Sequence, residues 1–474
     1  MIRQALTGKD AGSSTLCFLM LIALGAVSTT AQAASAGVVN NLVVNDTANA
    51  ADWSIQYSLT TGDRSFGDRS TTWSAINDAY YGWQFIRAAA DSASYTGSTL
   101  ASFSTLTKAQ IEVAWDTRSA APAWLLANWS DTGFDLLSSD NITFRVYKRD
   151  VNAGVAVNLG PAAGASMYGI IVKDTSPIGF ASLNALGQNG TTGGAGGATV
   201  TASTLADLVL YATSTDPLTI RVQGTIDMSP NGWGYKVPVK SNKTILGLGM
   251  NATLRFGGLQ VSDNEKNVII RNLTIQDSFQ SWDGKLGDWD AITVQNGAHH
   301  VWIDRCTLTH MEDGLVDIVK GADYVTVSNV KFINHNKTFA IGTDGYDNHP
   351  KVTAYHNYFA GTNQRNPLSN NSLTHVLNNY YEGITSYGAN SRREADVYVE
   401  ANYYRSSANI TDISDGNEGD IVFTSDNVKD NVTGRNEIRG SAFTPSSYYT
   451  YTKDSASTLP ASVVKMAGAG KIRK

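Results

Sequence analysis

The sequence is poor in cysteine, in charge and in long hydrophobic runs. Of its 474 residues only two are cysteine, Cys17 and Cys306, and charged residues make up 16 %. One cysteine remains after removal of the leader described below, so no internal disulfide can form. The formal net charge of −6 lacks the basic field of a nucleic-acid or anionic-membrane binder. We therefore expect no nucleic-acid and no membrane partner, and the length predicts two or three domains.

The first 33 residues have the pattern of a secretory signal peptide. Arg3 and Lys9 precede an apolar run from Leu16 to Val27, and Ala31-Gln32-Ala33 supplies small residues for cleavage. The run is shorter than the roughly 20 residues that a membrane span needs. We expect residues 1–33 to be removed and the protein to be secreted, with Cys306 as a buried core thiol.

Residues 34–174 are rich in aromatics and in short alternating runs such as Ile111–Trp115 and Ile142–Tyr147. Short strands separated by polar turns are typical of an antiparallel β-sandwich. The segment resembles accessory modules of secreted polysaccharide-degrading enzymes, in which exposed tryptophans stack on sugar rings. For each single tryptophan of this segment, we favour a position in the core of the sandwich over a contact with sugar. Six of the ten tryptophans fall in this segment, namely Trp53, Trp73, Trp83, Trp115, Trp124 and Trp129.

The second half of the chain is built on a repeated eight-residue pattern whose successive ends are 22 to 33 residues apart. Each copy is rich in β-branched and aromatic residues, and no amphipathic helix lies between the copies. This spacing predicts a β-solenoid whose rungs stack into long parallel sheets, and parallel crossovers favour the right hand. The copies are Val268–Ile275, Val301–Leu308, Val325–Phe332, Val352–Phe359, Thr374–Tyr381 and Val397–Tyr404.

The sixth position of this repeat predicts what lies inside the solenoid. It is apolar in the first three copies and asparagine in the last three, which indicates an apolar stack followed by a ladder of amides along the axis. Because Cys306 falls in this column, the repeat supports its assignment to the interior. The six residues are Leu273, Cys306, Val330, Asn357, Asn379 and Asn402.

Two acidic turns precede neighbouring rungs. Asp288 and Asp290 lie in the longest gap between repeats, and Asp313 and Asp317 lie in the next connection. Stacked rungs would bring the four carboxylates within a few ångströms of strand spacing. Like charges that close raise one another's pKa unless a cation joins them. Hard oxygen ligands in an irregular shell favour Ca²⁺, so the sequence predicts a calcium site, although each acidic pair alone is typical of a solvated turn.

Two basic residues follow on the next rung connections, Lys337 and Arg365. A single lysine or arginine in a loop is usually a surface charge, but the repeat register places this pair on consecutive rungs beyond the acidic turns. The expected result is a groove with a cation at one end and basic groups beside it, suited to an acidic polymer.

At these residues the sequence resembles polysaccharide lyase family 1, the pectate lyases, over roughly 179–404. The Gly-rich stretch, which by composition is typical of a linker, belongs in that family to the start of the catalytic domain. The strings that carry the resemblance are Gly179-Phe-Ala-Ser-Leu, Thr191-Thr-Gly-Gly-Ala-Gly-Gly197, Asp288-Trp-Asp290-Ala-Ile292, Val301-Trp-Ile-Asp304, Asp313-Gly-Leu-Val-Asp317, Asp323-Tyr-Val-Thr-Val-Ser328, Val352-Thr-Ala-Tyr-His-Asn-Tyr-Phe359 and Val399-Glu-Ala-Asn-Tyr-Tyr404.

The resemblance implies an all-β chain with a right-handed parallel β-helix over 175–474, preceded by the β-sandwich-like module. It implies cleavage of α-1,4-linked polygalacturonate by β-elimination with Ca²⁺ as cofactor. Carried over by position, Lys337 would bind the substrate carboxylate, and Arg365 would remove the proton from C5 of the uronate. An arginine base requires alkaline conditions, because its pKa ordinarily exceeds 12. The calcium ligands would be Asp288, Asp290, Asp313 and Asp317.

The sequence departs from the family pattern at two substrate-binding positions. Asn370 stands where the family usually has a second arginine, five residues after the base, and Arg305 replaces the histidine of the family's Trp-Ile-Asp-His string. We predict that both contribute to substrate binding. A third departure is Val319 where the family often has the lysine of Asp-Ile-Lys, with Lys320 one residue later, and we expect either Arg305 or Lys320 to compensate for the lost arginine. These departures keep a non-catalytic pectin-binding protein open as an alternative.

Two related enzymes remain as further alternatives. A β-helix polygalacturonase would hydrolyse the same bond with paired carboxylic acids, and a pectin lyase would act on methyl esters, for which four carboxylates have little use. We expect a monomer whose last residues, 406–474, form one more partial rung and then pack back on the solenoid.

Overall fold

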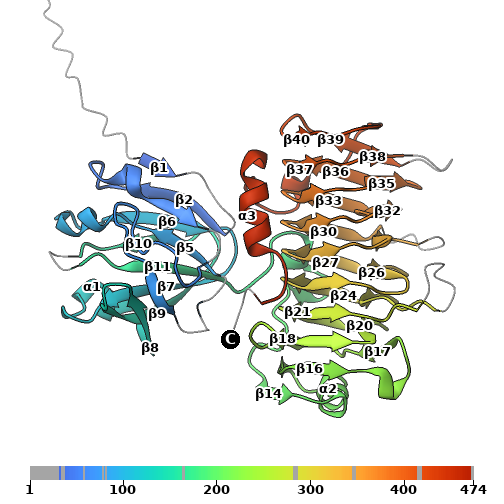
Figure 1. The fold of residues 1–474 in the computed structure, drawn as a ribbon, viewed down its shortest axis with the longest axis horizontal. Helices are drawn as coiled ribbons and strands as arrows, with labels where there is room; N and C mark the ends of the chain where they lie inside the picture. Colours follow the sequence, from blue (N-terminus) through green and yellow to red (C-terminus); the bar gives the residue numbers. More distant parts are fainter. Residues whose placement is uncertain are drawn as a thin grey trace, which may run out of the picture.

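The computed structural model describes residues 31–33, 38–56, 59–76, 80, 83–162, 166–280, 287–343, 349–413 and 419–470. An antiparallel module and a parallel solenoid lie side by side in it (Figure 1). The predicted signal peptide lies outside the described residues up to position 30, and β1 (Ala31–Ala33) pairs antiparallel with β2 (Val39–Val44). No helix in the described part of the chain is both long and apolar enough to cross a membrane.

The module consists of two antiparallel sheets around one core. In the part described, the smaller sheet has four strands, β1, β2, β6 (Ala101–Thr105) and β10 (Val157–Leu159). The order in the seven-stranded sheet is β3 (Ser54–Gln56), β5 (Gln84–Arg87), β11 (Gly169–Asp174), β7 (Ala109–Asp116), β9 (Thr143–Val151), β8 (Ser130–Ser138) and β4 (Trp73–Ile76). The only α-helix among the described residues of the module is α1 (Ala123–Asn128).

The tryptophans of the module are mostly core residues, as the favoured interpretation predicts. Five of the six are buried, and Trp124 is half-buried against Trp115, Trp129 and Tyr168. Their packing explains why an aromatic-rich sequence of short strands forms a sandwich, since each large ring buries a large apolar area between the sheets.

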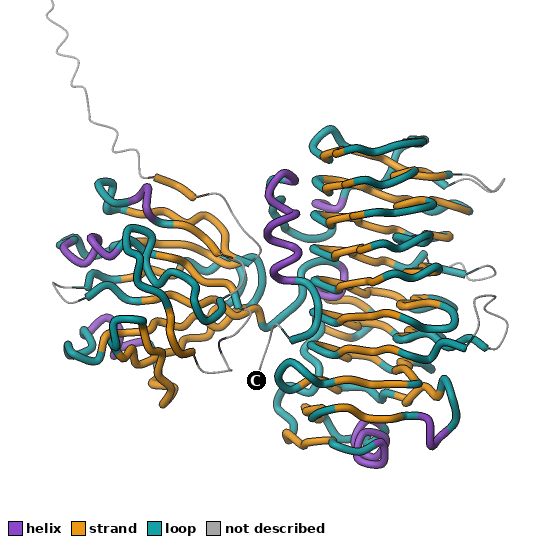
Figure 2. The backbone as a smooth tube through the Cα atoms, in the orientation of Figure 1, coloured by secondary structure: helices purple, strands orange, loops and turns teal. Residues whose placement is uncertain are grey.

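The solenoid has three parallel sheets, and Figure 2 shows its strands stacked as rungs with few helices. Within the described residues the first sheet contains β14 (Ala198–Ala202), β15 (Leu218–Val222), β18 (Lys243–Gly247), β21 (Lys266–Arg271), β24 (His299–Asp304), β27 (Asp323–Ser328), β30 (Lys351–Tyr355), β33 (Leu373–Leu377), β36 (Asp396–Glu400) and β39 (Asp420–Phe423). The second contains β16 (Thr225–Asp227), β19 (Thr253–Arg255), β22 (Thr274–Gln276), β25 (Thr307–Thr309), β28 (Lys331–Ile333), β31 (Tyr358–Ala360), β34 (Tyr380–Glu382), β37 (Tyr403–Arg405) and β40 (Val428–Asp430).

The third sheet carries the candidate site. Its described strands are β17 (Tyr235–Pro238), β20 (Gly257–Val261), β23 (Ile292–Val294), β26 (Gly314–Ile318), β29 (Lys337–Ile341), β32 (Leu368–Asn370), β35 (Tyr387–Arg392) and β38 (Asn409–Asp412). Each strand pairs in parallel with the strand of the next rung, so that residues in register point to the same side.

The repeat predicted from the sequence is the repeat of the structure. The first residues of the six octets pair in sequence along one sheet, from Val268 through Val301 to Val397. The predicted interior column is buried, and its amides form the expected ladder. The side-chain oxygen of Asn379 accepts from the backbone of Asn357 at 2.9 Å, and that of Asn402 accepts from the backbone of Asn379 at 2.7 Å.

Segments that the octets do not cover pack on one end and on one side of the solenoid (Figure 1). The Gly-rich stretch packs on the first rungs, where a Cβ at Gly194 would lie 2.0 Å from the carbonyl oxygen of Leu218. A helix, α2 (Leu205–Ala212), covers the same end. The C-terminal segment packs back on the rungs as predicted, with α3 (Leu459–Met466) against Tyr358 and Tyr380. An all-β parallel solenoid preceded by a sandwich-like module is therefore confirmed.

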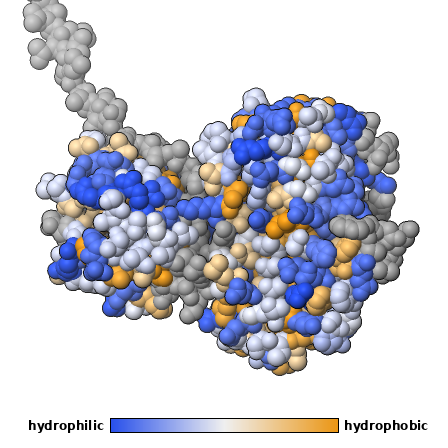
Figure 3. Space-filling model, in the orientation of Figure 1, coloured by the Kyte–Doolittle hydropathy of each residue, from blue (hydrophilic) through white to orange (hydrophobic). Residues whose placement is uncertain are grey.

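The module and the solenoid both have surfaces on which hydrophilic and hydrophobic side chains are mixed. On the face shown in Figure 3, hydrophilic side chains cover the module and the solenoid, and the hydrophobic ones are scattered in small groups. Each half encloses its own buried apolar core, so the two could fold around separate cores.

Candidate functional site

Two neighbouring rungs bring acidic side chains together at one edge of the third sheet. Asp288 and Asp290 lie in the loop before β23, Asp313 lies directly before β26, and Asp317 lies within β26. The strands pair in register, with Thr293 opposite Asp317. One carboxylate oxygen each from Asp288, Asp290 and Asp313 lies within 4.8 Å of the others. We call these four aspartates the acidic cluster.

Asp317 is the member of the acidic cluster with a buried, unpartnered oxygen. Its Oδ1 atom is buried and has no hydrogen-bond partner among the described residues. Burial raises the pKa of Asp317 well above its usual value, and the neighbouring carboxylate of Asp290 raises this pKa further, whereas the charge of Arg365 lowers it. An unpaired buried carboxylate oxygen is costly unless a cation contacts it.

The backbone beside the acidic cluster leaves room for these carboxylates. A Cβ at Gly314 would lie 2.2 Å from Oδ1 of Asp317 and 3.0 Å from Oδ1 of Asp290, so a side chain there would displace the Asp317 carboxylate. The amide of Gly314 donates to Oδ1 of Asp290 at 2.7 Å. The donor set is entirely oxygen, is irregular and contains one unsatisfied atom, which fits Ca²⁺ better than a softer metal.

The two predicted basic residues follow on the rungs beyond. Nζ of Lys337, at the start of β29, donates to Oδ1 of Asp313 at 2.6 Å. Arg365 precedes β32, and its carbonyl accepts from the amide of Phe339 at 2.8 Å. The Arg365 side chain is half-buried and makes no hydrogen bond or ion pair with any described residue. The positive charge of Arg365 nevertheless lowers the pKa of Asp317. The structure thus brings Lys337 and Arg365 to the acidic cluster.

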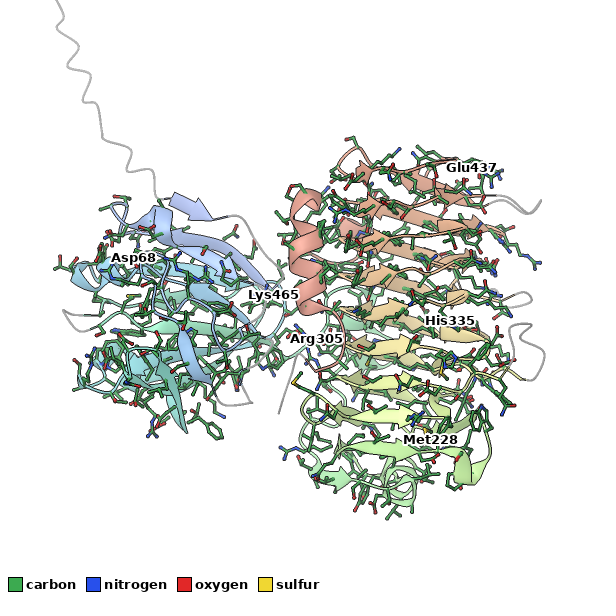
Figure 4. The ribbon with its side chains drawn as sticks, in the orientation of Figure 1. Asp68, Met228, Arg305, His335, Glu437 and Lys465 are labelled. Carbon is green, nitrogen blue, oxygen red and sulfur yellow. The ribbon has the colours of Figure 1, made fainter. Side chains whose placement is uncertain are left out.

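Arg305 lies elsewhere, and its predicted contact with substrate has no support in this geometry. Its guanidinium donates to Asp304 at 2.7 Å and to Asp174 of the module at 3.4 Å, and only 4 % of its side chain is exposed. Burial alone lowers the pKa of Arg305, but the carboxylates of Asp174 and Asp304 raise it above its ordinary value. Figure 4 shows Arg305 on the side of the solenoid that faces the module, away from His335, which bonds to the acidic cluster.

Asn370 does lie on the sheet of the site, at the end of β32. The strand of the next rung, β35, places Arg392 in register with it. Both side chains point to the outer side of the sheet, because their neighbours Ser369 and Ser391 are buried inside. Burial raises the pKa of Tyr387 in β35, whereas the charges of Arg392 and Arg365 lower it. Arg392 is a further basic residue on this sheet, in register with Asn370, that the sequence reasoning missed.

Two further residues at the acidic cluster were also missed. Nζ of Lys236, in β17, donates to Oδ2 of Asp290 at 2.7 Å. Nε2 of His335 donates to the carbonyl of Asp313 at 2.6 Å, and burial lowers the pKa of His335. Lys236 lies on a rung that precedes the first recognisable octet, so the repeat register could not place it. His335 stands two residues before Lys337, and that spacing was the only available signal.

Comparison with known proteins identifies the same architecture elsewhere. A family model described as pectate lyase matches residues 162–472. The pectate trisaccharide-lyase of Thermotoga maritima is 35 % identical over 332 residues, covering 62 % of this chain and 89 % of that protein. Pectate lyase plyB of Emericella nidulans is 37 % identical over 246 residues, covering 49 % of this chain and 69 % of that protein.

Solved structures show the same fold. A pectate lyase from a Bacillus species, crystallised in complex with trigalacturonate, superimposes with a TM-score of 0.54 at 32 % identity and covers 62 % of this chain and 99 % of that one. A pectate lyase variant from Xanthomonas campestris gives a TM-score of 0.53 at 26 % identity, covering 63 % of this chain and 99 % of that one. The matched part is the solenoid.

Proposed function

The chain belongs to the pectate lyase family, and we propose that it cleaves α-1,4-linked polygalacturonate by calcium-dependent β-elimination. The observation that carries the proposal is the pairing of the acidic cluster with Arg365, a guanidinium without a hydrogen-bonding partner among the described residues. A base must be free to approach its proton, and a carboxylate cluster must be neutralised. In this arrangement Arg365 can approach the substrate proton, and the carboxylates of the acidic cluster can be neutralised by a bound cation.

The residues that would hold calcium are Asp288, Asp290, Asp313 and Asp317. When bound, calcium would neutralise the uronate carboxylate and make the neighbouring C–H more acidic, as a Lewis acid does. Lys337 would contact the same carboxylate, because its ammonium already lies at the rim of the acidic cluster on Asp313. Asn370 and Arg392 would orient the adjoining sugar through hydrogen bonds from the outer side of the sheet.

Arg365 would act as the base. Its neutral guanidine takes the proton from C5 of the uronate, the C5–H electron pair forms the C4–C5 double bond, and the C4–O4 bond breaks. The leaving oxygen takes a proton from solvent. The products are oligogalacturonides with a 4,5-unsaturated end. Since only a neutral guanidine accepts a proton, we expect the rate to rise toward alkaline pH.

The substrate proposed here is consistent with a relative that was crystallised with trigalacturonate. We also propose that the protein is exported, on the strength of the signal-like pattern in residues 1–33. A hydrolase and a lyase specific for methyl esters remain distinguishable by their products and substrates.

The direct test is near-ultraviolet absorbance on polygalacturonate at alkaline pH. We expect absorbance to rise with calcium, to stop with chelator, and to fall at least about 1000-fold in Arg365→Ala, because a general base contributes roughly this much. Arg393→Ala, which removes an exposed arginine nearby, is the matched control and should stay close to wild type. Reducing ends without absorbance would show hydrolysis, and activity on esterified pectin alone would show a pectin lyase.

A further inference from the structure

Lys236 is a cation that the chain itself supplies to the acidic cluster. Its Nζ donates to Oδ2 of Asp290 at 2.7 Å and to Oγ1 of Thr293 at 2.8 Å, and it lies 3.9 Å from Oδ2 of Asp288. Only 11 % of the side chain is exposed, and the side chain of Asp290 is 1 % exposed. This contact is therefore largely shielded from solvent, where an ion pair is stronger than at an open surface.

Close backbone packing around Lys236 places its side chain next to the acidic cluster. A Cβ at Gly234 would lie 2.3 Å from the ring of Trp289, so that ring packs directly on the chain two residues before Lys236. Lys236 pairs in register with Gly258 on the next strand. A Cβ at Gly258 would lie 2.3 Å from the carbonyl oxygen of Asp290. The missing side chain at Gly258 lets the backbone of Asp290 approach this strand closely, and Lys236 reaches the Asp290 carboxylate across it.

Lys236 and Lys337 occupy different sides of the acidic cluster. Lys337 contacts Asp313 and is 27 % exposed, so a substrate can reach it. Lys236 contacts Asp290 across the intervening strand β20 and also donates to Thr293. A substrate carboxylate has less access to Lys236, and its ammonium is engaged by two protein oxygens. Its charge acts mainly on the carboxylates themselves.

We propose that Lys236 is the internal counter-cation of the calcium site, which holds the acidic cluster together without calcium and weakens calcium binding. The inference rests on the proposed calcium site. Each carboxylate oxygen accepts more than one partner, so Asp290 can keep Lys236 while it contacts calcium. The ammonium then repels the divalent ion at close range, and without calcium it offsets repulsion among Asp288, Asp290 and Asp317. Lys236 is thus an affinity-tuning residue rather than a catalytic one.

Calcium binding of the full-length protein tests this directly, without substrate. Isothermal titration calorimetry with calcium chloride should show Lys236→Met binding calcium at least about 10-fold more tightly than wild type. In chelator the melting temperature of Lys236→Met should fall below that of wild type, and in saturating calcium the difference should close or reverse. Lys240→Met removes an exposed lysine paired with Glu265, and it should leave calcium affinity unchanged.

A charge-preserving variant separates the effect of charge from that of shape. Lys236→Arg should bind calcium within about 3-fold of wild type. Weaker or unchanged calcium binding by Lys236→Met would overturn the proposal, as would an equal shift in Lys236→Arg. If wild type itself bound no calcium in calorimetry, the calcium site and this inference would fail together. Elimination by Arg365 would then be judged separately, from the absorbance assay.

Discussion

Asn370 stands where a second arginine is expected, and the next strand supplies Arg392 beside it. We predict that Arg392→Ala lowers kcat/KM on polygalacturonate about 10- to 100-fold, mainly through a higher KM. The physical reason is that a hydrogen bond from a charged donor to a carboxylate contributes about 1.5–3 kcal/mol. Steady-state kinetics over a range of oligomer lengths measures the effect.

Arg393→Ala is the matched control, because Arg393 adjoins Arg392 in the chain but is exposed beyond the end of β35. It should change kcat/KM less than about 2-fold. An unchanged KM in Arg392→Ala would show that Asn370 alone serves this position. A second variant, Asn370→Arg, should partly restore binding in the Arg392→Ala background.

The residues of the site differ in how far the sequence could place them. Asp313, Asp317 and Lys337 were predictable because they follow the octets Val301–Leu308 and Val325–Phe332 at short intervals, in the connections of neighbouring rungs. Arg305 lies within an octet too, but no pattern in the sequence indicates that its side of the solenoid faces Asp174 of the module. Lys236 lies on an early rung without a recognisable repeat, so its contact with Asp290 required the three-dimensional structure.

The asparagine ladder is a stabilising element that follows the solenoid axis. Asn379 is fully buried, its Nδ2 donates to the carbonyl of Ala354 at 2.9 Å, and its Oδ1 accepts from the amide of Asn357. We predict that Asn379→Leu lowers the free energy of unfolding by about 3 kcal/mol, since it leaves buried backbone groups unpaired at about 1–3 kcal/mol each. Chemical denaturation measures this loss.

Asn251→Leu is the control for this prediction, because Asn251 is an exposed asparagine outside the ladder. It should change the free energy of unfolding by less than about 0.5 kcal/mol. A loss in Asn379→Leu no larger than in the control would mean that the ladder contributes nothing net. Val330, which precedes the ladder, already donates its amide to Asn357 at 2.9 Å.

Strands of the solenoid could be predicted and their connections could not. The octets fix one sheet and its continuation into the second, because β-branched and aromatic residues recur at a constant offset. The loop that carries Asp288 and Asp290 lies in the longest gap between octets, where the repeat spacing does not apply, so only its acidity was informative. In the module, the alternation in Ile111–Trp115 predicted a strand that is indeed part of β7, but not which strands would be its neighbours.

Buried histidines make the stability of the whole molecule depend on pH. Burial lowers the pKa of His299 to about 4, and it also lowers the pKa values of His300, His335 and His375. These groups stay neutral in the folded chain at pH values where the unfolded chain binds protons. Their contribution to stability is therefore complete above about pH 6.5 and is lost as pH falls toward 4.

Denaturant titrations at several pH values test this dependence. We expect the free energy of unfolding to be flat near pH 8 and to fall below pH 6.5, with each histidine adding up to about 1.4 kcal/mol per pH unit. His299→Gln should make the slope between pH 6 and 5 shallower. A slope that is the same in the variant and in wild type would show that His299 takes no part.

Module and solenoid are joined by a buried group of charges. Asp174, the last residue of β11, accepts from Arg271 at 2.9 Å, and Asp304 accepts from both Arg271 and Arg305. Trp83 of the module lies 5.2 Å from the guanidinium of Arg271. A second contact joins Lys465, which is labelled in Figure 4, to Asp63 at 3.1 Å. Two buried arginines thus need carboxylates from both halves, which ties the module to the solenoid.

Removing the charge of Asp174, which the module supplies to this group, should weaken the contact between the module and the solenoid. Asp174→Asn leaves Arg271 and Arg305 with Asp304 as their only carboxylate among these groups, and breaking a buried ion pair costs roughly 3 kcal/mol. We expect one cooperative thermal transition to split into two and the radius of gyration in solution to increase. Asp150→Asn, at an exposed carboxylate that bonds Gln110, should change neither. Because the acidic cluster lies away from this junction, calcium affinity should stay at the wild-type value, and a loss of calcium binding would instead mean that the module supports the site.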